Sequence, residues 1–184
     1  MRIIAGKYRN RKLMTLDGLA TRPTIERTKQ AIFNSLGQFF HNGEITLDIF
    51  GGSGALSLES LSRGAKKAYI IDSSPDAIAI IKKNAEMLRV TGDLEIIKGD
   101  YKEILPNMVG KMKFDVIFLD PPFRMKVIDE LITYIINNKL LQIGGMIVAE
   151  YPKIDIIRKN YEELTLKKCS TYASSEVVIF VANI

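Results

Sequence analysis

Residues Asp120, Pro121, Pro122 and Phe123 stand directly after the apolar run 114–119. Proline cannot continue a central strand, so the pair would end one there. The tetrad also suits chemistry on the amine of a nucleobase, a weak nucleophile because its lone pair is delocalised into the ring. Asp120 and a carbonyl of the proline region could accept its N–H hydrogen bonds and turn the lone pair towards a methyl donor. Phe123 could stack on the base.

A glycine-rich loop follows an earlier apolar run, in the segment DIFGGSGALSLES. Gly51, Gly52 and Gly54 would allow a tight turn and close approach of the backbone to a ligand. The third glycine of a dinucleotide-binding loop is replaced by Ser57, and the Gly-Lys-Ser/Thr of a P-loop is absent. The loop therefore indicates a ligand with less phosphate than a nucleoside triphosphate.

Acidic residues end the next two apolar runs, at Asp72 and Asp100. A carboxylate at the end of the second strand can accept hydrogen bonds from both ribose hydroxyls. Each acid alone is more typical of a cap or a turn, but together with the glycine loop they indicate a nucleoside pocket. S-adenosylmethionine, which carries a ribose without a pyrophosphate, fits this pocket, and NAD is the competing ligand.

Strands and helices are predicted to alternate through most of the chain. Ser74 and Pro75 are suited to the start of one helix, at 73–88, and a later helix is expected at 124–138. The predicted strands are 45–50, 66–72, 94–100, 114–120, 144–151, 163–169 and 176–183, the last two forming an antiparallel pair. Such alternation predicts a doubly wound α/β fold with a mostly parallel, Rossmann-like sheet of about seven strands.

An N-terminal extension precedes this pattern. Residues 2–13 are predicted to form a short hairpin or extended arm, followed by a helix at 21–36 with Pro23 in its first turn. Gly37 or Gly43 would end that helix. One apolar face is expected on it, made of Ile25, Ile32, Phe33 and Leu36.

The N-terminal arm is strongly basic and has no acid before Asp17. Its cations are Arg2, Lys7, Arg9, Arg11 and Lys12. Such a cluster favours binding of a polyanion, although a solvated arm would also explain it. Arg22 and Arg27 lie where cations oppose a helix dipole, which favours an external anion, whereas Arg63 is interpreted as a structural cation at a helix end.

Composition narrows the class of protein. The 184 residues are 47% apolar and 26% charged, with a formal net charge of +5, as expected for one globular domain. The chain has one cysteine, Cys169, which we expect to be partly buried in a strand, and one histidine, His41. A disulfide framework within the chain and a zinc site made of histidines and cysteines are therefore excluded. No segment is apolar for long enough to span a bilayer. We expect a soluble, cytoplasmic monomer that needs no metal and no membrane.

The segments RIIAGKYRNRKL, TRPTIERTKQAIFNSL, LDIFGGSGALSLESLSRGA and FLDPPF together resemble the RsmD family of bacterial small-subunit ribosomal RNA methyltransferases. The resemblance covers nearly the whole chain and is strongest over residues 1–65. It implies a class I methyltransferase fold and transfer of a methyl group from S-adenosylmethionine to the 2-amino group of a guanine in small-subunit (16S) ribosomal RNA. The DPPF motif alone is shared with many amino-methyltransferases, including those that act on DNA adenine.

This resemblance implies roles for individual residues. The tetrad 120–123 would hold the guanine. Cofactor binding would fall to Asp48, Phe50, Gly51, Ser53, Gly54, Asp72, Ser73, Asp100 and Tyr101. RNA would be bound by Arg2, Lys7, Arg9, Arg11, Lys12, Arg22, Thr24 and Arg27. Residues 1–43 would then form an RNA-facing region and 44–184 the methyltransferase domain, with ribosomal RNA, the small subunit or its assembly intermediate as partner.

Alternative functions remain open from the sequence. One is an amino-methyltransferase that acts on DNA adenine or on another RNA base. Others are an NAD-dependent oxidoreductase and a noncatalytic nucleoside-binding module. The small size of the chain, with no separate target-recognition domain, speaks against specific DNA binding.

Overall fold

The structure is a computed structural model that describes residues 1–16, 23–41 and 43–183. The helices are α1 (Pro23–Leu36), α2 (Ala55–Ser62), α3 (Pro75–Leu88), α4 (Tyr101–Met108) and α5 (Ile128–Asn137). The strands are β1 (Ile45–Asp48), β2 (Lys67–Asp72), β3 (Leu94–Lys98), β4 (Phe114–Leu119), β5 (Leu141–Pro152), β6 (Leu164–Thr171) and β7 (Ser175–Ala182). None of these helices is long and apolar enough to cross a membrane.

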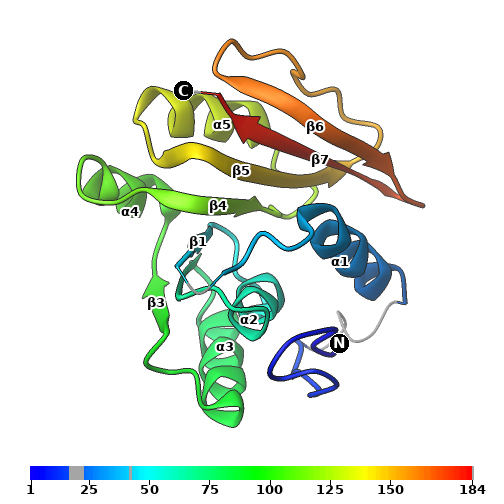
Figure 1. Ribbon diagram of the computed structural model, residues 1–184, viewed down its shortest axis with the longest axis vertical. Helices are drawn as coiled ribbons and strands as arrows, with labels where there is room; N and C mark the ends of the chain where they lie inside the picture. Colours follow the sequence, from blue (N-terminus) through cyan, green and yellow to red (C-terminus); the bar gives the residue numbers. More distant parts are fainter. Residues whose placement is uncertain (17–22, 42, 184) are drawn as a thin grey trace.

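The strands form one sheet in the order β3-β2-β1-β4-β5-β7-β6 (Figure 1). Strands β1 to β5 are parallel, whereas β7 runs antiparallel to both β5 and β6. The chain moves outward from β1 to β3 and then returns to the other side of β1 with β4. This reversal is the topological switch point of a doubly wound fold, where ligands bind beyond the carboxyl ends of the strands. The predicted fold class is confirmed.

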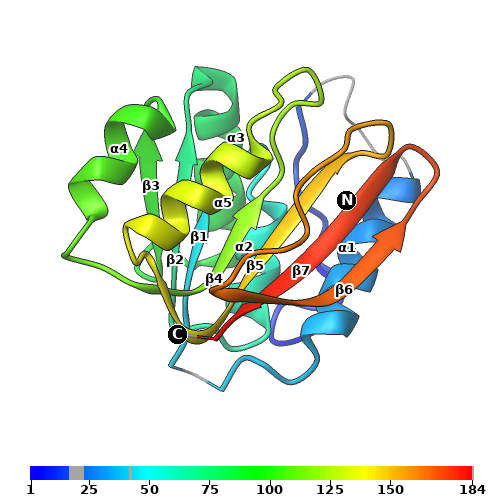
Figure 2. The same ribbon diagram turned by 90° about the horizontal axis from the view of Figure 1, so that it is seen from above.

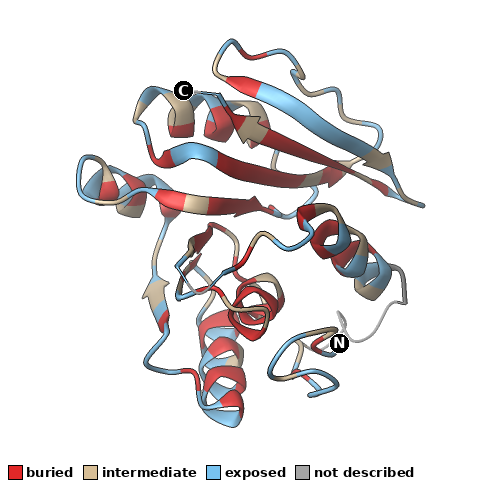
Figure 3. Cartoon of the chain, in the orientation of Figure 1, coloured by how far each residue is buried: buried red, intermediate tan, exposed pale blue. Residues whose placement is uncertain are grey.

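Helices cover both faces of the sheet (Figure 2). On β4, Val116 and Phe118 join the core beneath α1, α2 and α3, whereas Ile117 and Leu119 join the core beneath α4 and α5. This division follows from the two-residue period of a strand, because neighbouring side chains point to opposite faces. Strands β4, β5 and β7 are accordingly buried along most of their length (Figure 3), which explains their continuous apolar sequence.

The N-terminal arm is a hairpin, as predicted. Arg2 pairs with Lys12 in an antiparallel bridge, and Ile3 donates a backbone hydrogen bond to Arg11 (2.9 Å). Asn10 adopts a positive φ of 69° in its turn, a conformation that asparagine tolerates better than most residues. A Cβ atom on Gly6 would collide with the backbone of Ser62, so the arm packs directly on the end of α2.

Some local predictions were wrong. Helix α4 was not expected; it is only eight residues long and contains Pro106, so its sequence carries a weak helical signal. Helix α5 begins at Ile128 rather than at residue 124, because the preceding residues belong to the loop after β4. Cys169 is exposed, since β6 is an edge strand that turns most of its side chains to solvent. Ile25 is exposed at the margin of the apolar face of α1.

Candidate active site

The glycine loop lies at the carboxyl end of β1, at the switch point. The backbone N–H of Gly54 donates to the carbonyl of Gly51 (2.7 Å), and both Gly52 and Gly54 have positive φ angles, of 56° and 79°. A Cβ atom on Gly51 would collide with Ile70, so packing against β2 requires this glycine. A Cβ atom on Gly52 would meet no atom within 4 Å, so that position faces open space. Gly52 therefore lies on the open side of the loop, where protein atoms leave space.

Asp72, at the end of β2, is held in place by two backbone donors. Its Oδ2 accepts from the N–H of Gly52 (2.8 Å) and its Oδ1 from the N–H of Ser74 (2.8 Å). Ser74 in turn caps α3 by accepting from Ala77, which confirms its predicted role. The carboxylate is half-buried, next to exposed Ser73. These bonds fix its orientation and leave lone pairs for a ligand, because each carboxylate oxygen can accept a second bond.

Asp48, the last residue of β1, is a buried carboxyl group with 1% of its surface exposed. Burial raises its pKa to about 7; the backbone N–H of Phe50 opposes this rise, and the negative charge of Asp72 adds to it. The hydroxyl of Ser57 lies close enough to oppose this rise in pKa as well, but among the described residues neither that hydroxyl nor Oδ1 of Asp48 has a partner with hydrogen-bond geometry. A buried polar atom of this kind is costly unless a ligand or water satisfies it.

The aromatic rings of Phe50, directly before the glycine loop, and Tyr101, at the start of α4, lie against each other. Their ring centroids are 5.3 Å apart in an edge-on arrangement. The Tyr101 hydroxyl is buried and has no hydrogen-bond partner in the described part of the chain. Asp100 is exposed and caps α4 by accepting from the N–H of Lys102 (2.9 Å). The cap explains Asp100 structurally, and its carboxylate also stands at the end of the third strand, as predicted.

The tetrad 120–123 forms the loop after β4. Pro121 is buried, whereas Pro122 and Phe123 are exposed, with 47% of the surface of Phe123 open to solvent. The carbonyl of Pro122 accepts from the N–H of Met125 (2.8 Å), which closes a tight turn. An aromatic ring exposed on a stiff loop is an unusual surface feature, and here it adjoins the carboxyl end of a central strand.

Glu150, on β5, is a residue of this site that the sequence analysis missed. Leu119 and Ala149 are register partners on β4 and β5, so Asp120 and Glu150 follow side by side. Asp120 is exposed, yet protein atoms crowd its carboxyl group; this desolvation, then the charges of Glu150 and Asp48, raise its pKa above the ordinary value. Burial likewise raises the pKa of Glu150. The sequence shows only that Glu150 is the first charged residue after an apolar run, which does not place it beside Asp120.

The cations of the arm, Arg2, Lys7, Arg9, Arg11 and Lys12, are all exposed, as is Arg27 on α1. Arg22 and the side chain of Thr24 lie outside the described part of the chain. Arg2 pairs with Glu26 across a distance of 3.5 Å. The exposed cations on one hairpin agree with a polyanion-binding surface, but their exposure alone also fits a solvated arm.

A buried acid, Glu59, holds the arm in place. Its carboxylate accepts from the backbone N–H groups of Ile4 (2.9 Å) and Ala5 (3.1 Å) and pairs with Lys29 (3.0 Å) and Arg63 (2.8 Å). Lys29 is also buried, and burial lowers its pKa although Glu59 opposes this effect. Arg63 is thus a structural cation, as predicted. The sequence analysis did not identify Glu59, because a polar residue within a helix usually faces solvent.

Asn84, buried on α3, connects the arm to the glycine loop. Its amide donates to the carbonyls of Met14 (3.0 Å) and Ser53 (2.9 Å), and its Oδ1 accepts from the N–H of Met14 (2.8 Å). One side chain therefore fixes the end of the basic hairpin relative to the loop at the switch point.

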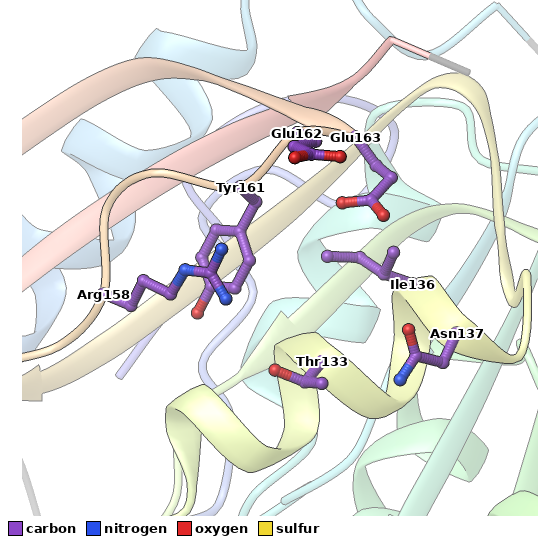
Figure 4. Close-up of a pocket in the computed structure, with 7 residues that line it drawn as sticks. All are labelled: Thr133, Ile136, Asn137, Arg158, Tyr161, Glu162 and Glu163. Atoms are coloured by element: carbon purple, nitrogen blue, oxygen red, sulfur yellow. The ribbon is translucent and has the colours of Figure 1, made fainter.

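Two cavities lie elsewhere on the molecule. One, of about 200 Å³, is lined by Thr133, Ile136, Asn137, Arg158, Tyr161, Glu162 and Glu163 (Figure 4). The other, of about 300 Å³, lies between the arm, the segment after α1 and Arg63. Ile136 and Asn137 are the last residues of α5, just before β5 begins. The first cavity therefore lies near the amino-terminal ends of the strands, whereas Asp120 follows the carboxyl end of β4. Neither contains a residue that the sequence analysis placed in the active site.

The strand order with its antiparallel terminal pair is that of the Rossmann-like, class I S-adenosylmethionine-dependent methyltransferase fold. The solved structure of the Escherichia coli protein yhhF matches it with a TM-score of 0.87 at 28% identity, covering 100% of this chain and 98% of that chain. The Haemophilus influenzae protein HI0767 matches with a TM-score of 0.83 at 31% identity, covering 100% and 98%.

A family model described as Conserved hypothetical protein 95 matches residues 1–181. Several curated relatives are named Ribosomal RNA small subunit methyltransferase D, and two of them illustrate the similarity. The Haemophilus influenzae protein is 36% identical over 154 residues, covering 83% of this chain and 79% of the relative. The Escherichia coli K12 protein is 33% identical over 150 residues, covering 82% and 74%. The chain belongs to this family, which is the RsmD family that the sequence motifs indicated.

Proposed function

We propose that this protein transfers a methyl group from S-adenosylmethionine to the exocyclic 2-amino group of a guanine in small-subunit (16S) ribosomal RNA. One observation carries the proposal most directly. Strands β1 and β4 are neighbours, with Asp48 and Phe118 in register, so the glycine loop and the tetrad 120–123 leave the sheet side by side. The proposed nucleoside pocket and the proposed binding site for a base amine would therefore adjoin. The names of the two curated relatives support ribosomal RNA of the small subunit as the substrate.

The pocket fits the proposed cofactor. Asp72 has free lone pairs for ribose hydroxyls, and Gly52 opens the loop on the ligand side. The unpartnered oxygens of Asp48 and Tyr101 provide polar positions that a ligand could satisfy. The wider cofactor-binding set would be Asp48, Phe50, Gly51, Ser53, Gly54, Asp72, Ser73, Asp100 and Tyr101. A structural relative with the same fold, SMU.776, was solved with SAH at 14% identity and a TM-score of 0.72.

The chain's own residues would position the amine. Asp120 would accept one N–H bond, and the carbonyl of Pro121 is the better second acceptor because that of Pro122 already bonds Met125. The prolines reduce the entropy that is lost when this loop is ordered. Phe123 would stack on the base, which must be unstacked or flipped to reach the site.

When bound, S-adenosylmethionine supplies an electrophilic methyl group, and its sulfur atom keeps the electron pair of the broken S–C bond as the N–C bond forms. The amine nitrogen then carries one proton too many. Asp120 would accept this proton and release it to solvent, which a carboxyl group with a raised pKa and an exposed face can do. Catalysis would depend on orientation and electrostatics rather than on a strong base.

Residues 1–43 would face the RNA and residues 44–184 would form the catalytic domain, in a cytoplasmic monomer. The cations of the arm would contact phosphates, with Arg22, Thr24 and Arg27 nearer the mouth of the site. The substrate would be ribosomal RNA, the small subunit or an assembly intermediate of it. Phosphate contacts position a protein without reading sequence, so recognition of the base would fall to the site itself.

The decisive test uses Asp120→Ala with small-subunit RNA from cells that lack this protein. We expect methyl transfer to be lost while the affinity for S-adenosylmethionine stays within about tenfold, or about 1.4 kcal/mol, by calorimetry. Asp115→Ala, on the same strand at its opposite end, is the control for a lost aspartate. Retained turnover in the Asp120 variant would remove this residue from its role. Binding of NAD without binding of S-adenosylmethionine would overturn the methyltransferase assignment.

A further inference from the structure

Two carboxylates, rather than one, face the place where the target base would lie. Strands β4 and β5 are parallel neighbours, and the pairing of Leu119 with Ala149 brings Asp120 and Glu150 next to each other. Phe118 and Val148, two residues earlier on each strand, both pack into the core beneath α1, α2 and α3. By the period of a strand, Asp120 and Glu150 start towards that same face.

The orientation of Glu150 is fixed. Ser175, on the neighbouring strand β7, donates its hydroxyl hydrogen bond to Oε1 of Glu150 (2.7 Å). Ser175 is buried, and Glu150 is half-buried. One oxygen of Glu150 is thereby anchored, which leaves the other in position to accept a hydrogen bond from a ligand.

Two further features point to a flat, hydrogen-bonding ligand here. The exposed ring of Phe123 follows Asp120 on the same short loop and offers a stacking surface. Asp48, whose charge also acts on Asp120, has a buried oxygen without a partner among the described residues. The site thus combines an aromatic platform with several acceptors and, in the described part of the chain, includes no cation that pairs with Asp120 or Glu150.

Two neighbouring acceptors match a base edge that presents two neighbouring donors. Guanine has such an edge, with N1–H beside the 2-amino group. Adenine and cytosine each place a ring-nitrogen lone pair beside their amine, and this lone pair would face a carboxylate oxygen. A site built to pair with a donor rejects an analogue that lacks it, because the acceptor is then left unpaired.

We propose that Glu150 is a specificity-determining residue that accepts the N1–H hydrogen bond of the target guanine while Asp120 accepts from its 2-amino group. This assignment rests on the proposed function and adds to it the reason why guanine is chosen. Ser175 is then a positioning residue, because it acts through Glu150 rather than on the base.

The test compares two RNAs that differ only at the methylated nucleotide. One carries guanosine, and the other carries 2-aminopurine riboside, which keeps the 2-amino group but has a lone pair at N1. We expect the wild-type protein to prefer guanosine by roughly tenfold or more in kcat/KM, as for one unpaired buried acceptor. No preference in the wild-type protein would overturn the proposal without any variant.

Glu150→Gln supplies the second arm of the test, because its amide can donate to N1 of 2-aminopurine. We expect the guanosine preference to fall to about onefold in this variant. Glu163→Gln, in the cavity near the amino-terminal ends of the strands, is the matched control and should keep the wild-type ratio. The ratio is unaffected by a general loss of folded protein, so a destabilised variant still gives an answer.

The outcomes distinguish a failure of the role proposed for Glu150 from a failure of the proposed function. If the wild-type protein methylates guanosine but Glu150→Gln keeps the same preference, another group reads N1 and the role of Glu150 is refuted. If the wild-type protein methylates neither RNA nor natural small-subunit RNA, the proposed function itself fails.

Discussion

Replacing Asp48 with asparagine should stabilise the ligand-free protein relative to the wild type by an amount that grows from about pH 5 to about pH 8 and then levels off. The carboxyl group is buried and has a pKa of about 7, compared with an ordinary value of 3.8. The folded protein therefore holds a proton on Asp48 in a pH range where the unfolded chain has already released it. Stability falls wherever the folded state binds more protons, so the proton that folded Asp48 retains, and the unfolded chain has released, makes the fold less stable as the pH rises from about 4 to about 7.

The structure sets the size of this effect. Each tenfold difference in proton affinity is worth about 1.4 kcal/mol, so the full difference amounts to about 4 kcal/mol above pH 7. Some of this is already lost at about pH 5, which leaves about 2 to 3 kcal/mol between pH 5 and pH 8. The asparagine side chain of the variant would not titrate. The stability difference between the Asp48→Asn variant and the wild type should therefore grow by that amount over this range.

Urea unfolding of both proteins at several pH values, without any ligand, measures this difference directly. Any hydrogen bonds that asparagine gains or loses change the difference equally at all pH values, so only its slope reports on the ionisation of Asp48. Thr46→Val, which removes another buried unpartnered polar atom on the same strand but no charge, is the control and should give a flat difference. A flat difference for Asp48→Asn would refute the reasoning.

Three other outcomes are expected. Glu59→Gln should lower the free energy of unfolding by about 3 kcal/mol in urea, because it leaves a buried lysine without its countercharge. Methyl transfer should decline on acidification with a midpoint above 3.8, the ordinary pKa of an aspartate, because Asp120 must be ionised to accept a hydrogen bond. Glu150→Gln should lower that midpoint, and an unchanged midpoint would show that the charge of Glu150 does not act on Asp120. RNA binding should lose part of its salt dependence when arm cations are neutralised, and an unchanged slope in filter binding would contradict phosphate contacts by Arg9, Arg11 and Lys12.

The sheet could be predicted from the sequence because apolar runs of four to eight residues alternate with amphipathic helices, a pattern that few folds satisfy. The carboxyl ends of parallel strands meet at one end of a sheet, so the glycines and acids that end the predicted strands could be expected to lie together, whereas the strand order that makes the switch point is known only from the structure. Helix α4 escaped prediction because Pro106 and its short length remove the usual periodic signal. The exposure of Cys169 depends on β6 being an edge strand, and strand order cannot be inferred from one apolar run.

Some acids of the candidate site could be proposed from the sequence, and one could not. Asp72 and Asp120 could be proposed as site residues because each ends an apolar run, the first before Ser73 and Ser74 and the second before two prolines, which marks the end of a strand. Glu150 lies inside the long strand β5, where no turn residue marks it, so only the register with β4 shows that it stands beside Asp120. Gly51 was assigned to the ligand, but contact with Ile70 already explains why no larger residue fits there.

A variant of Glu59, which holds the arm in place, gives a stricter test of RNA binding by the arm than variants of the arm's cations do. Removing the negative charge of Glu59 should, on electrostatic grounds alone, strengthen binding to a polyanion. The contacts indicate the opposite, because Glu59 binds the backbone of Ile4 and Ala5 and so holds the hairpin on α2. A hairpin already ordered in the free protein loses less entropy when its cations meet phosphates. Glu59→Gln should therefore weaken RNA binding. The control is Glu26→Gln, which removes an acid at the surface near Arg2 and should leave RNA binding unchanged or strengthen it. Tighter binding in the Glu59 variant would show that the arm binds RNA as a flexible segment.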